Sequence, residues 1–312
     1  MGSKRNSAVL ARKSAEEGLN SYDKSRTPET VSLLKGVVPP LKWVTLLREI
    51  SQMHYERGEY EYALRSLEKR LEILSETGNR GEEIDTLIGM GYINLLLSNY
   101  WAVLKHFGRA LSLVREVGDH SCESTVLLGI GTAYERLKLY YSAIRCYEET
   151  ARIGHELGMP EVEGAGYLRV AKTYMKLGKY SAALVSFLRA LRAMFGAGNP
   201  GGEGVALQGV GDAYYGLEHY EGALICYEES LNIYRELDDK AGEASVLRRI
   251  GRIYTDLEFY SHAIKYFDDA LRVTTRVRPG EAERINATIR NLRAVSRMSE
   301  TFRYLRNNLS AN

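Results

Sequence analysis

The sequence predicts an all-α solenoid of antiparallel helix pairs with a C-terminal capping helix, and three observations indicate it. Tyrosines recur every 40 residues, at Tyr60, Tyr100, Tyr140, Tyr180, Tyr220 and Tyr260. A small or β-branched residue follows each of them after three positions, and a large apolar residue after seven. A glycine or alanine precedes the later tyrosines by nine positions, and a glutamate column shares the period. An internal repeat of this length is typical of a solenoid.

The unit around residues 127–157 predicts two helices. Ile130 and Tyr134 belong to a run with helical spacing, and a second such run starts at Tyr140. Because only a few residues separate the two runs, the helices are expected to fold back antiparallel. The small residue Gly131 is expected to let the two helix backbones approach closely.

The segments between helices carry glycines in phase with the repeat. They fit the C-caps of helices, and they are Gly78, Gly118, Gly158 and Gly198. The segment 198–204, GNPGGEG, lacks the Lys-Ser/Thr that completes a phosphate-binding loop. We expect it to be a flexible loop between two repeats.

Three segments are expected along the chain. Residues 1–40 form an N-terminal segment with a degenerate first helix pair, and residues 41–278 form six units of 40 residues, of which the first begins with a helix over about 42–57. Residues 279–312 form an amphipathic basic helix that caps the last unit. Its expected apolar stripe is Ile285, Ile289, Leu292, Val295, Phe302 and Leu305.

Charge is distributed unevenly along the chain. The net charge is +3 over residues 1–40, −7 over 41–270 and +6 over 271–312, which sum to the formal +2 of the whole chain. Basic ends of this kind are able to meet an acidic lipid or an acidic partner, although a solvated capping helix is the more common explanation.

No catalytic residue, metal site or cofactor is expected. The sequence lacks H-E-x-x-H, G-x-S-x-G and C-x-x-C, and its six histidines share no ligand spacing. Three cysteines rule out a disulfide scaffold and indicate a reducing compartment. Nucleic-acid binding is disfavoured, because the basic residues cluster at the ends without interleaved aromatic residues.

The N-terminus has no apolar region of a secretory signal. Gly2 is a lipidation candidate, although Asn6 stands where the myristoylation pattern prefers Ser or Thr. Lys4 and Arg5 would add electrostatic attraction to a membrane. The alternative is an ordinary disordered start. A cytoplasmic protein is expected, at the inner face of the plasma membrane if Gly2 is acylated, and the uncharged run 86–104 is not expected to span a bilayer.

The repeat resembles the tetratricopeptide repeat (TPR), whose small Gly/Ala, Tyr, Ala and Phe/Tyr columns match here. The 40-residue unit is similar to the subclass found in the LGN/Pins adaptors and rapsyn, and the Met-Gly start and residues 15–37 resemble the N-terminus of rapsyn. The chain departs from rapsyn because no cysteine follows Cys226, so no RING module can be carried over. The GoLoco-type tail of LGN is also not matched.

The resemblance implies a right-handed superhelix whose first helices line a concave groove. The columns expected to contact a partner lie three before, one after and four after each glycine column: Ile88, Tyr92, Leu128, Thr132, Glu135, Lys172, Met175, Gln208, Asp212, Tyr215, Arg248 and Arg252. We expect this groove to hold an extended or helical peptide. Ile88, Tyr92, Leu128 and Met175 would anchor bulky side chains, and Arg248 and Arg252 would bind acidic groups. In the alternative interpretation some of these side chains are only solvated.

The predicted function is that of a non-enzymatic scaffold or adaptor for protein partners. Three versions stay open. The first is a rapsyn-like, membrane-associated scaffold that clusters receptors and links them to the cytoskeleton. The second is an LGN-like polarity or spindle adaptor, and the third is a repeat-only regulatory subunit of a motor or ciliary complex.

Overall fold

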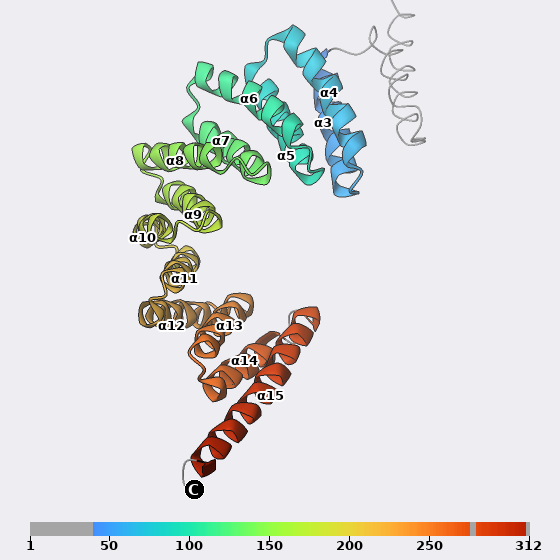
Figure 1. Cartoon of the computed structure of the whole chain (residues 1–312). Coiled ribbons are helices and arrows are strands. Elements are labelled where there is room, and N and C mark those ends of the chain that lie inside the picture. The colour runs from blue at the N-terminus through green and yellow to red at the C-terminus, as the bar shows by residue number, and fades with distance from the viewer. Residues whose placement is uncertain (1–39, 275–278, 310–312) are drawn as a thin grey trace, which may run out of the picture. The chain divides into compact units, whose positions relative to one another are not determined.

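The computed structural model describes residues 40–274 and 279–309, and their side chains over 42–274 and 280–298. The expected degenerate helix pair and the lipidation candidate Gly2 lie outside the described residues. Within them the chain is all-α, and its helices pack as successive antiparallel pairs followed by a C-terminal helix (Figure 1), so the predicted fold class is confirmed.

The helix pairs keep the same register, and their helices are 15 to 18 residues long. The pairs are α3 (Pro40–Glu56) with α4 (Tyr60–Thr77), α5 (Arg80–Leu96) with α6 (Tyr100–Val117), α7 (His120–Arg136) with α8 (Tyr140–Glu156), α9 (Pro160–Lys176) with α10 (Tyr180–Gly196), α11 (Pro200–Gly216) with α12 (Tyr220–Glu236), and α13 (Lys240–Asp256) with α14 (Tyr260–Thr274). The last helix is α15 (Pro279–Leu309). The first helix thus begins two residues before its expected start at 42.

The chain divides into two compact units. The first spans residues 1–118 and holds α3 to α6, and the second spans residues 119–312 and holds α7 to α15. In the second unit α8, α10 and α12 form an outer row, whereas α9, α11 and α13 lie on the inner side (Figure 1). Most of the residues that the sequence predicts to contact a partner therefore lie on these inner helices.

The glycine column makes room for an aromatic ring. A Cβ atom built on Gly131 would lie 2.5 Å from Cε1 of Tyr147, and one built on Gly211 would lie 2.5 Å from Cε1 of Tyr227. Both rings are almost completely buried. This corrects the expectation for Gly131, because the absent side chain admits a ring of the second helix rather than the second backbone.

Two other glycines bring helix backbones together, and sequence reasoning did not single them out. A Cβ atom on Gly154 of α8 would lie 2.4 Å from the backbone nitrogen of Glu163, and one on Gly166 of α9 would lie 2.7 Å from the backbone nitrogen of Ala151. Backbone atoms cannot move aside as a flexible side chain can. The close packing of α8 on α9 therefore requires glycine at both positions.

Each loop between α3 and α14 turns through the left-handed region, at an interval of 20 residues. Six of these positions are glycines, including all four expected C-cap positions, with φ between +60° and +73°. The other five are Ser98, Lys138, Glu218, Asp238 and Glu258, with φ between +53° and +61°. L-residues adopt this conformation at a cost of about 1–2 kcal/mol. The fixed turn therefore dominates over residue type at these sites.

Gly118→Ala is expected to lower the free energy of unfolding by about 1 kcal/mol, because alanine is strained at a positive φ. Gly118 caps α6 with φ +73°, and no atom lies within 4 Å of an added Cβ, so the strain acts without a clash. Gly108→Ala in the middle of α6 is the matched control, since an added Cβ there also meets no atom. It is expected to raise stability by about 0.5–1 kcal/mol. Urea unfolding measures the free energy of unfolding of both variants. Changes of the same sign would contradict the assignment of the Gly118→Ala effect to backbone strain at a positive φ.

The segment 198–204 is mostly helical, which corrects the expected flexible loop. Only Gly198 and Asn199 form the turn, and α11 starts at Pro200. The Asn199 side chain accepts a hydrogen bond of 2.8 Å from the backbone nitrogen of Gly202 and so caps the helix. A side chain at position 202 would meet Met194, because a Cβ atom built on Gly202 would lie 2.4 Å from Sδ of Met194. The glycines therefore serve helix packing.

Two of the repeated glutamates fasten the start of a first helix to a neighbouring second helix. Glu83 is buried and pairs with Arg109 of α6, and Glu243 pairs with Arg235 of α12 at 3.0 Å. Carboxylates are favoured in the first turn of a helix, where the backbone N–H groups point outward. These two glutamates are therefore structural.

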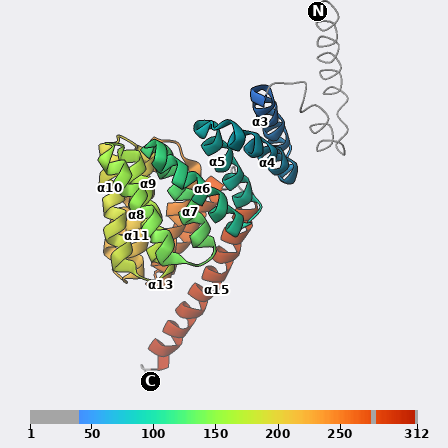
Figure 2. The same ribbon diagram turned by 90° about the horizontal axis from the view of Figure 1, so that it is seen from above.

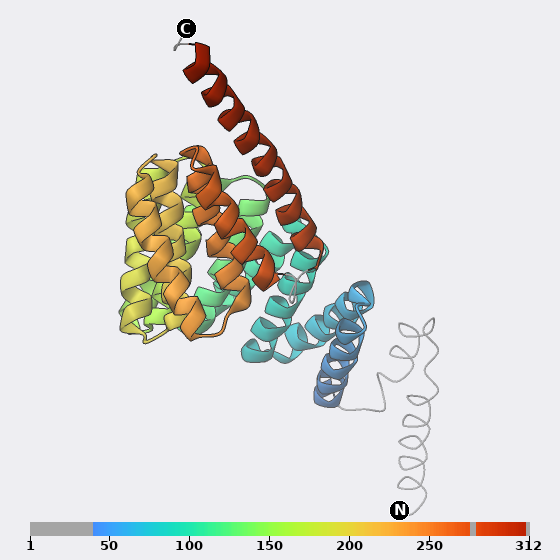
Figure 3. The same ribbon diagram turned by 90° about the horizontal axis from the view of Figure 1, so that it is seen from below.

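Helix α15 packs on α14 by its first half. Ile285, Ile289 and Leu292 are buried, and Arg293 pairs with Asp268 of α14 at 3.3 Å. Val295 is 43% exposed, so the predicted apolar stripe is wrong at that residue. The remaining stripe residues, Phe302 and Leu305, lie outside the described side chains. Figures 2 and 3 show that α15 runs on beyond the ends of the paired helices, and no helix in the described ranges is long and apolar enough to cross a membrane.

Candidate functional site

The structure places every predicted groove residue on a first helix of a pair, and none of them is buried. Ile88 and Tyr92 lie on α5 in the first unit. The other ten lie in the second unit, on α7 (Leu128, Thr132, Glu135), α9 (Lys172, Met175), α11 (Gln208, Asp212, Tyr215) and α13 (Arg248, Arg252).

The two apolar positions of the first unit differ in exposure. Ile88 is half-buried, whereas Tyr92 is 42% exposed. The ring of Tyr92 stands edge-on to Phe107, with 5.4 Å between the ring centroids. Burial raises the pKa of the Tyr92 hydroxyl. Tyr92 therefore packs on Phe107 of its own helix pair and also exposes part of its ring to solvent.

Two aromatic residues of the second helices, Tyr147 and Tyr227, reach polar side chains of the first helices through their hydroxyl groups. Tyr147 donates a hydrogen bond of 3.2 Å to Glu135, and Tyr227 donates one of 2.8 Å to Asp212. The two rings pass over Gly131 and Gly211, where the missing side chain leaves the gap. Burial raises the pKa of both hydroxyls, and the adjacent carboxylates add to the effect.

Glu135 is the centre of a polar cluster between α7 and α9. Its carboxylate pairs with Lys176 and accepts hydrogen bonds from Tyr147 at 3.2 Å and Thr173 at 3.4 Å. Desolvation opposes ionisation, but the hydrogen bonds from Lys176 and Tyr147 outweigh it and lower the pKa of Glu135. This predicted partner-binding residue is therefore already engaged within the chain.

Asp212 is held in the same way between α11 and α13. Arg249 reaches its two carboxylate oxygens with Nε at 2.7 Å and Nη2 at 3.2 Å, which is bidentate pairing. Arg249 is also hydrogen-bonded to Ser245 at 2.8 Å. Sequence reasoning missed Arg249. A signal was present, because Arg249 occupies a column that holds glycine at Gly89 and Gly209.

Arg252 stacks on an aromatic ring at the inner face. Its guanidinium carbon lies 4.6 Å from the centroid of the Tyr215 ring, and the Tyr215 hydroxyl is bonded to Asp256. Stacking on an aromatic face stabilises a cation and leaves the guanidinium edges for an anion. Arg252 is exposed.

Three cations of the inner face have no carboxylate within 4.0 Å in the described part of the chain: Arg169 and Lys172 of α9, and Arg252 of α13. Desolvation lowers the pKa of Lys172, and the charge of Arg169 lowers it further, whereas Asp212 acts in the opposite direction. The inner face thus holds positive charge that its own acids do not neutralise.

A pocket of about 520 Å³ brings together five of the predicted residues: Met175, Asp212, Tyr215, Arg248 and Arg252. Tyr180, Tyr227 and Arg249 also line it. The other predicted residues of α7 and α9, among them Leu128, Thr132 and Lys172, do not line this pocket. The pocket joins aromatic and thioether surface to three guanidinium groups, which is a combination suited to a peptide with acidic and apolar side chains.

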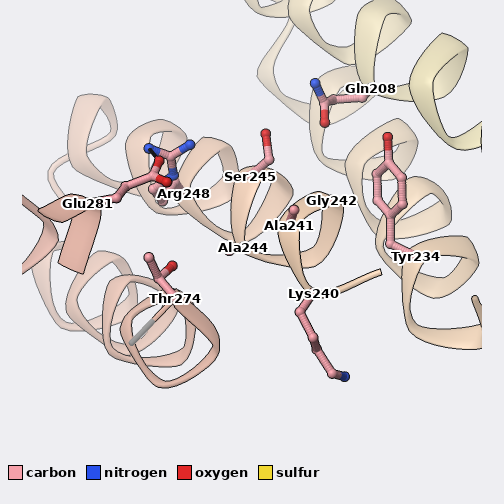
Figure 4. A pocket seen from close by; sticks show the side chains of 10 residues that line it. All are labelled: Gln208, Tyr234, Lys240, Ala241, Gly242, Ala244, Ser245, Arg248, Thr274 and Glu281. Atoms are coloured by element: carbon pink, nitrogen blue, oxygen red, sulfur yellow. Dashed lines mark ion pairs between the residues drawn. The ribbon is translucent and has the colours of Figure 1, made fainter. Parts of the chain in front are cut away.

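A second pocket, also lined by Arg248, is formed by residues of α11 to α14 and the start of α15 (Figure 4). Gln208 and Tyr234 line one side of it. On the opposite side Nη1 of Arg248 pairs with Oε1 of Glu281 at 2.5 Å. Arg248 therefore has an acidic partner of its own, which the sequence did not reveal.

Residues able to bind a metal do not cluster in the described ranges, where no group of three His, Cys, Asp or Glu side chains could hold an ion. Cys226 is half-buried, and burial raises the pKa of its thiol to about 11.

A family model supports the interpretation of the repeats. The model described as tetratricopeptide repeat matches residues 162–236 and 204–276. These ranges contain most of the inner-face cations and the pocket around Tyr215. No curated protein sequence matches the chain.

Solved structures with the same fold have low sequence identity. A signal-transduction ATPase with a tetratricopeptide repeat sensor from Pyrococcus horikoshii matches with a TM-score of 0.63 and 17% identity, over 86% of this chain and 42% of that protein. The chain therefore spans less than half of that protein. The apo form of RapI matches with a TM-score of 0.58 and 14% identity, over 80% of this chain and 98% of RapI. A putative kinesin light chain from Podosopora anserina matches with a TM-score of 0.55 and 12% identity, over 64% of this chain and 98% of that chain.

These likenesses establish the fold alone. The family match identifies residues 162–276 as tetratricopeptide repeats, and the helix pairs before them have the same 40-residue register.

Proposed function

We propose that this chain is a non-enzymatic scaffold that binds an acidic, partly apolar peptide segment on the inner face of α9, α11 and α13. The observation that carries the proposal is the pocket in which Met175, Tyr215 and Arg252 meet. Charge-assisted hydrogen bonds from guanidinium groups to carboxylates are stronger than neutral ones, and aromatic walls give contact area at low entropic cost.

The cations of the groove differ in what they can offer. Arg249 is committed to Asp212, and Lys176 is committed to Glu135. Arg252 is held by Tyr215 and has no carboxylate partner in the described part of the chain. We therefore assign the main contact with an acidic ligand to Arg252, with Lys172 adding charge from α9.

The apolar part of the ligand would lie against the residues beside Arg252. Met175 and Tyr215 are half-buried and line the pocket together with Tyr180. Methionine fits varied apolar side chains because it is flexible and polarisable. The mixture supports a ligand that alternates acidic and apolar side chains.

Arg252→Glu is expected to weaken binding of such a peptide by about tenfold or more, which corresponds to ~1.4 kcal/mol. The probe is a fluorescein-labelled twelve-residue peptide of alternating Glu and Leu, and its counterpart of alternating Gln and Leu is expected to bind more weakly. Fluorescence anisotropy measures Kd. Higher ionic strength is expected to weaken binding, because exposed charges are screened.

Arg192→Glu is the matched control, since Arg192 is exposed on α10 in the outer row and the change in charge is the same. It is expected to leave Kd unchanged. Arg252→Glu is expected to leave the melting temperature nearly unchanged, because Arg252 is exposed. Equal loss of binding in both variants, or equal affinity for the Glu and Gln peptides, would overturn the proposal.

Three cellular roles are compatible with this chemistry. We propose first a rapsyn-like scaffold beneath a membrane, for which acylation of Gly2 would be the decisive evidence. The second role is an LGN-like adaptor, although the positions that carry asparagine in LGN-type grooves are Tyr92, Thr132, Lys172, Asp212 and Arg252 here. The third is a regulatory subunit of a motor or ciliary complex, for which one tight, salt-resistant partner would be the decisive evidence.

A further inference from the structure

We infer that Arg248 forms a carboxylate subsite at the C-terminal end of the groove, that Glu281 of α15 occupies it in the free chain, and that a carboxylate of the ligand displaces Glu281. This inference rests on the proposed function, because it concerns a second contact of the same ligand. It adds a regulatory role for α15.

The existing ion pair shows which chemistry Arg248 accepts. Nη1 of Arg248 lies 2.5 Å from Oε1 of Glu281, which stands in the first turn of α15. The two side chains are 36% and 24% exposed, so water and a ligand can reach the pair. A partly exposed ion pair between two side chains contributes little net stability. Glu281 is therefore an occupant that a competing carboxylate can replace.

The position of Arg248 connects the pair to the groove. Arg248 and Ser245 line the pocket around Tyr215 and Arg252, and they also line the pocket beside Glu281. Figure 4 shows Arg248 turned toward Glu281, on the opposite side of the pocket from Gln208 and Tyr234. A peptide bound along α13 thus meets Arg252 first and Arg248 one helical turn away, since four residues separate them.

The guanidinium group of Arg248 is only partly used. Its Nε atom is buried and has no hydrogen-bond partner among the described residues. A buried donor without a partner is unfavourable, and a guanidinium can bind a carboxylate through two parallel hydrogen bonds. The pair with Glu281 does not engage Nε, and a ligand carboxylate would satisfy this donor if the guanidinium turns and exposes Nε as Glu281 leaves.

Competition between the two carboxylates sets the size of the effect. The apparent affinity of the ligand equals its intrinsic affinity multiplied by the fraction of chains in which Glu281 does not occupy the subsite. Because an exposed ion pair is weak, removal of Glu281 is expected to raise the affinity for the Glu–Leu peptide by about three- to fivefold.

The test uses Glu281→Gln in the full chain with the Glu–Leu peptide as probe. The matched control is Asp268→Asn, which removes the exposed pair between Asp268 and Arg293 at 3.3 Å. This control makes the same change in net charge and also loosens α15 from α14, but it leaves Arg248 untouched. A gain in affinity for Glu281→Gln and none for Asp268→Asn is the expected result. The gain should disappear when Arg248→Gln is added.

The outcomes separate this inference from the proposed function. If the wild type binds the peptide, Arg252→Glu weakens binding and Glu281→Gln has no effect or weakens it, the inference is overturned and the proposed function stands. Equal gains for Glu281→Gln and Asp268→Asn would also overturn it, because they would point to the docking of α15 in general. If neither the wild type nor Glu281→Gln binds the peptide, both the proposed function and the inference are overturned. Melting temperatures of all variants exclude unfolding as the cause.

Discussion

Tyr147→Ala is expected to lower the free energy of unfolding by about 3–5 kcal/mol, the usual cost of deleting a large buried aromatic side chain. The ring of Tyr147 is fully buried and fills the space that Gly131 leaves open. Alanine would leave a cavity between α7 and α8 and would remove the hydroxyl that binds Glu135. Urea unfolding followed by far-UV circular dichroism measures the loss.

Two substitutions separate the parts of this effect. Tyr147→Phe keeps the ring and removes only the hydrogen bond to Glu135, so it is expected to cost about 1 kcal/mol. Tyr141→Ala on the same helix removes a ring that is 59% exposed, and it is expected to change stability by no more than about 0.5 kcal/mol. Comparable losses for Tyr141→Ala and Tyr147→Ala would contradict the assignment of Tyr147 to the core.

Arg70→Ala is expected to destabilise the first unit by about 3 kcal/mol, because it removes the guanidinium that binds polar groups of α3 and α5. Arg70 of α4 is 2% exposed. Its guanidinium donates to the carbonyl oxygen of Val44 in α3 at 3.1 Å, and it also binds Glu82 and Thr86 of α5. One side chain therefore links three successive helices.

The repeat provides a comparison for this site. Thr150 and Ser230 occupy the same column, and each donates to a carbonyl oxygen 26 residues earlier, as Arg70 does. Arg65→Ala, on the exposed face of α4, is the control and is expected to change stability by about 0.5 kcal/mol or less. Thermal unfolding measures the stability of both variants. If Arg70→Ala loses no more stability than Arg65→Ala, Arg70 does not hold the helices together.

The helix pairs were predictable because their determinants are local and repeated. The tyrosine that starts each second helix, the aromatic residue seven positions later and the glycine that receives that aromatic ring occur at fixed spacing, so one unit explains the others. The close approach of Gly154 to Glu163 was missed, because this glycine occurs in a single repeat and its partner lies across a loop. The helical start at Pro200 was missed because glycine-rich composition usually indicates a loop.

The candidate site was predictable only in outline. The columns of the first helices indicated which residues face away from the core, and none of the predicted residues is buried. The charge pairs that decide which of them are available involve residues far apart in sequence. Glu281 lies 33 positions after Arg248 and outside the repeat, and no periodic pattern predicts such a contact.

The turns spaced 20 residues apart have a consequence for how such a chain can change in length. Because equivalent turn positions share one backbone conformation, a 40-residue cassette can be duplicated or excised between two of them without creating a new loop. The splice joins helices whose neighbours present the same columns, and in a stacked array each unit contacts mainly its neighbours. Recombination within the gene would thus lengthen or shorten the inner face in whole steps while the C-terminal helix, with Glu281, stays attached to the final pair.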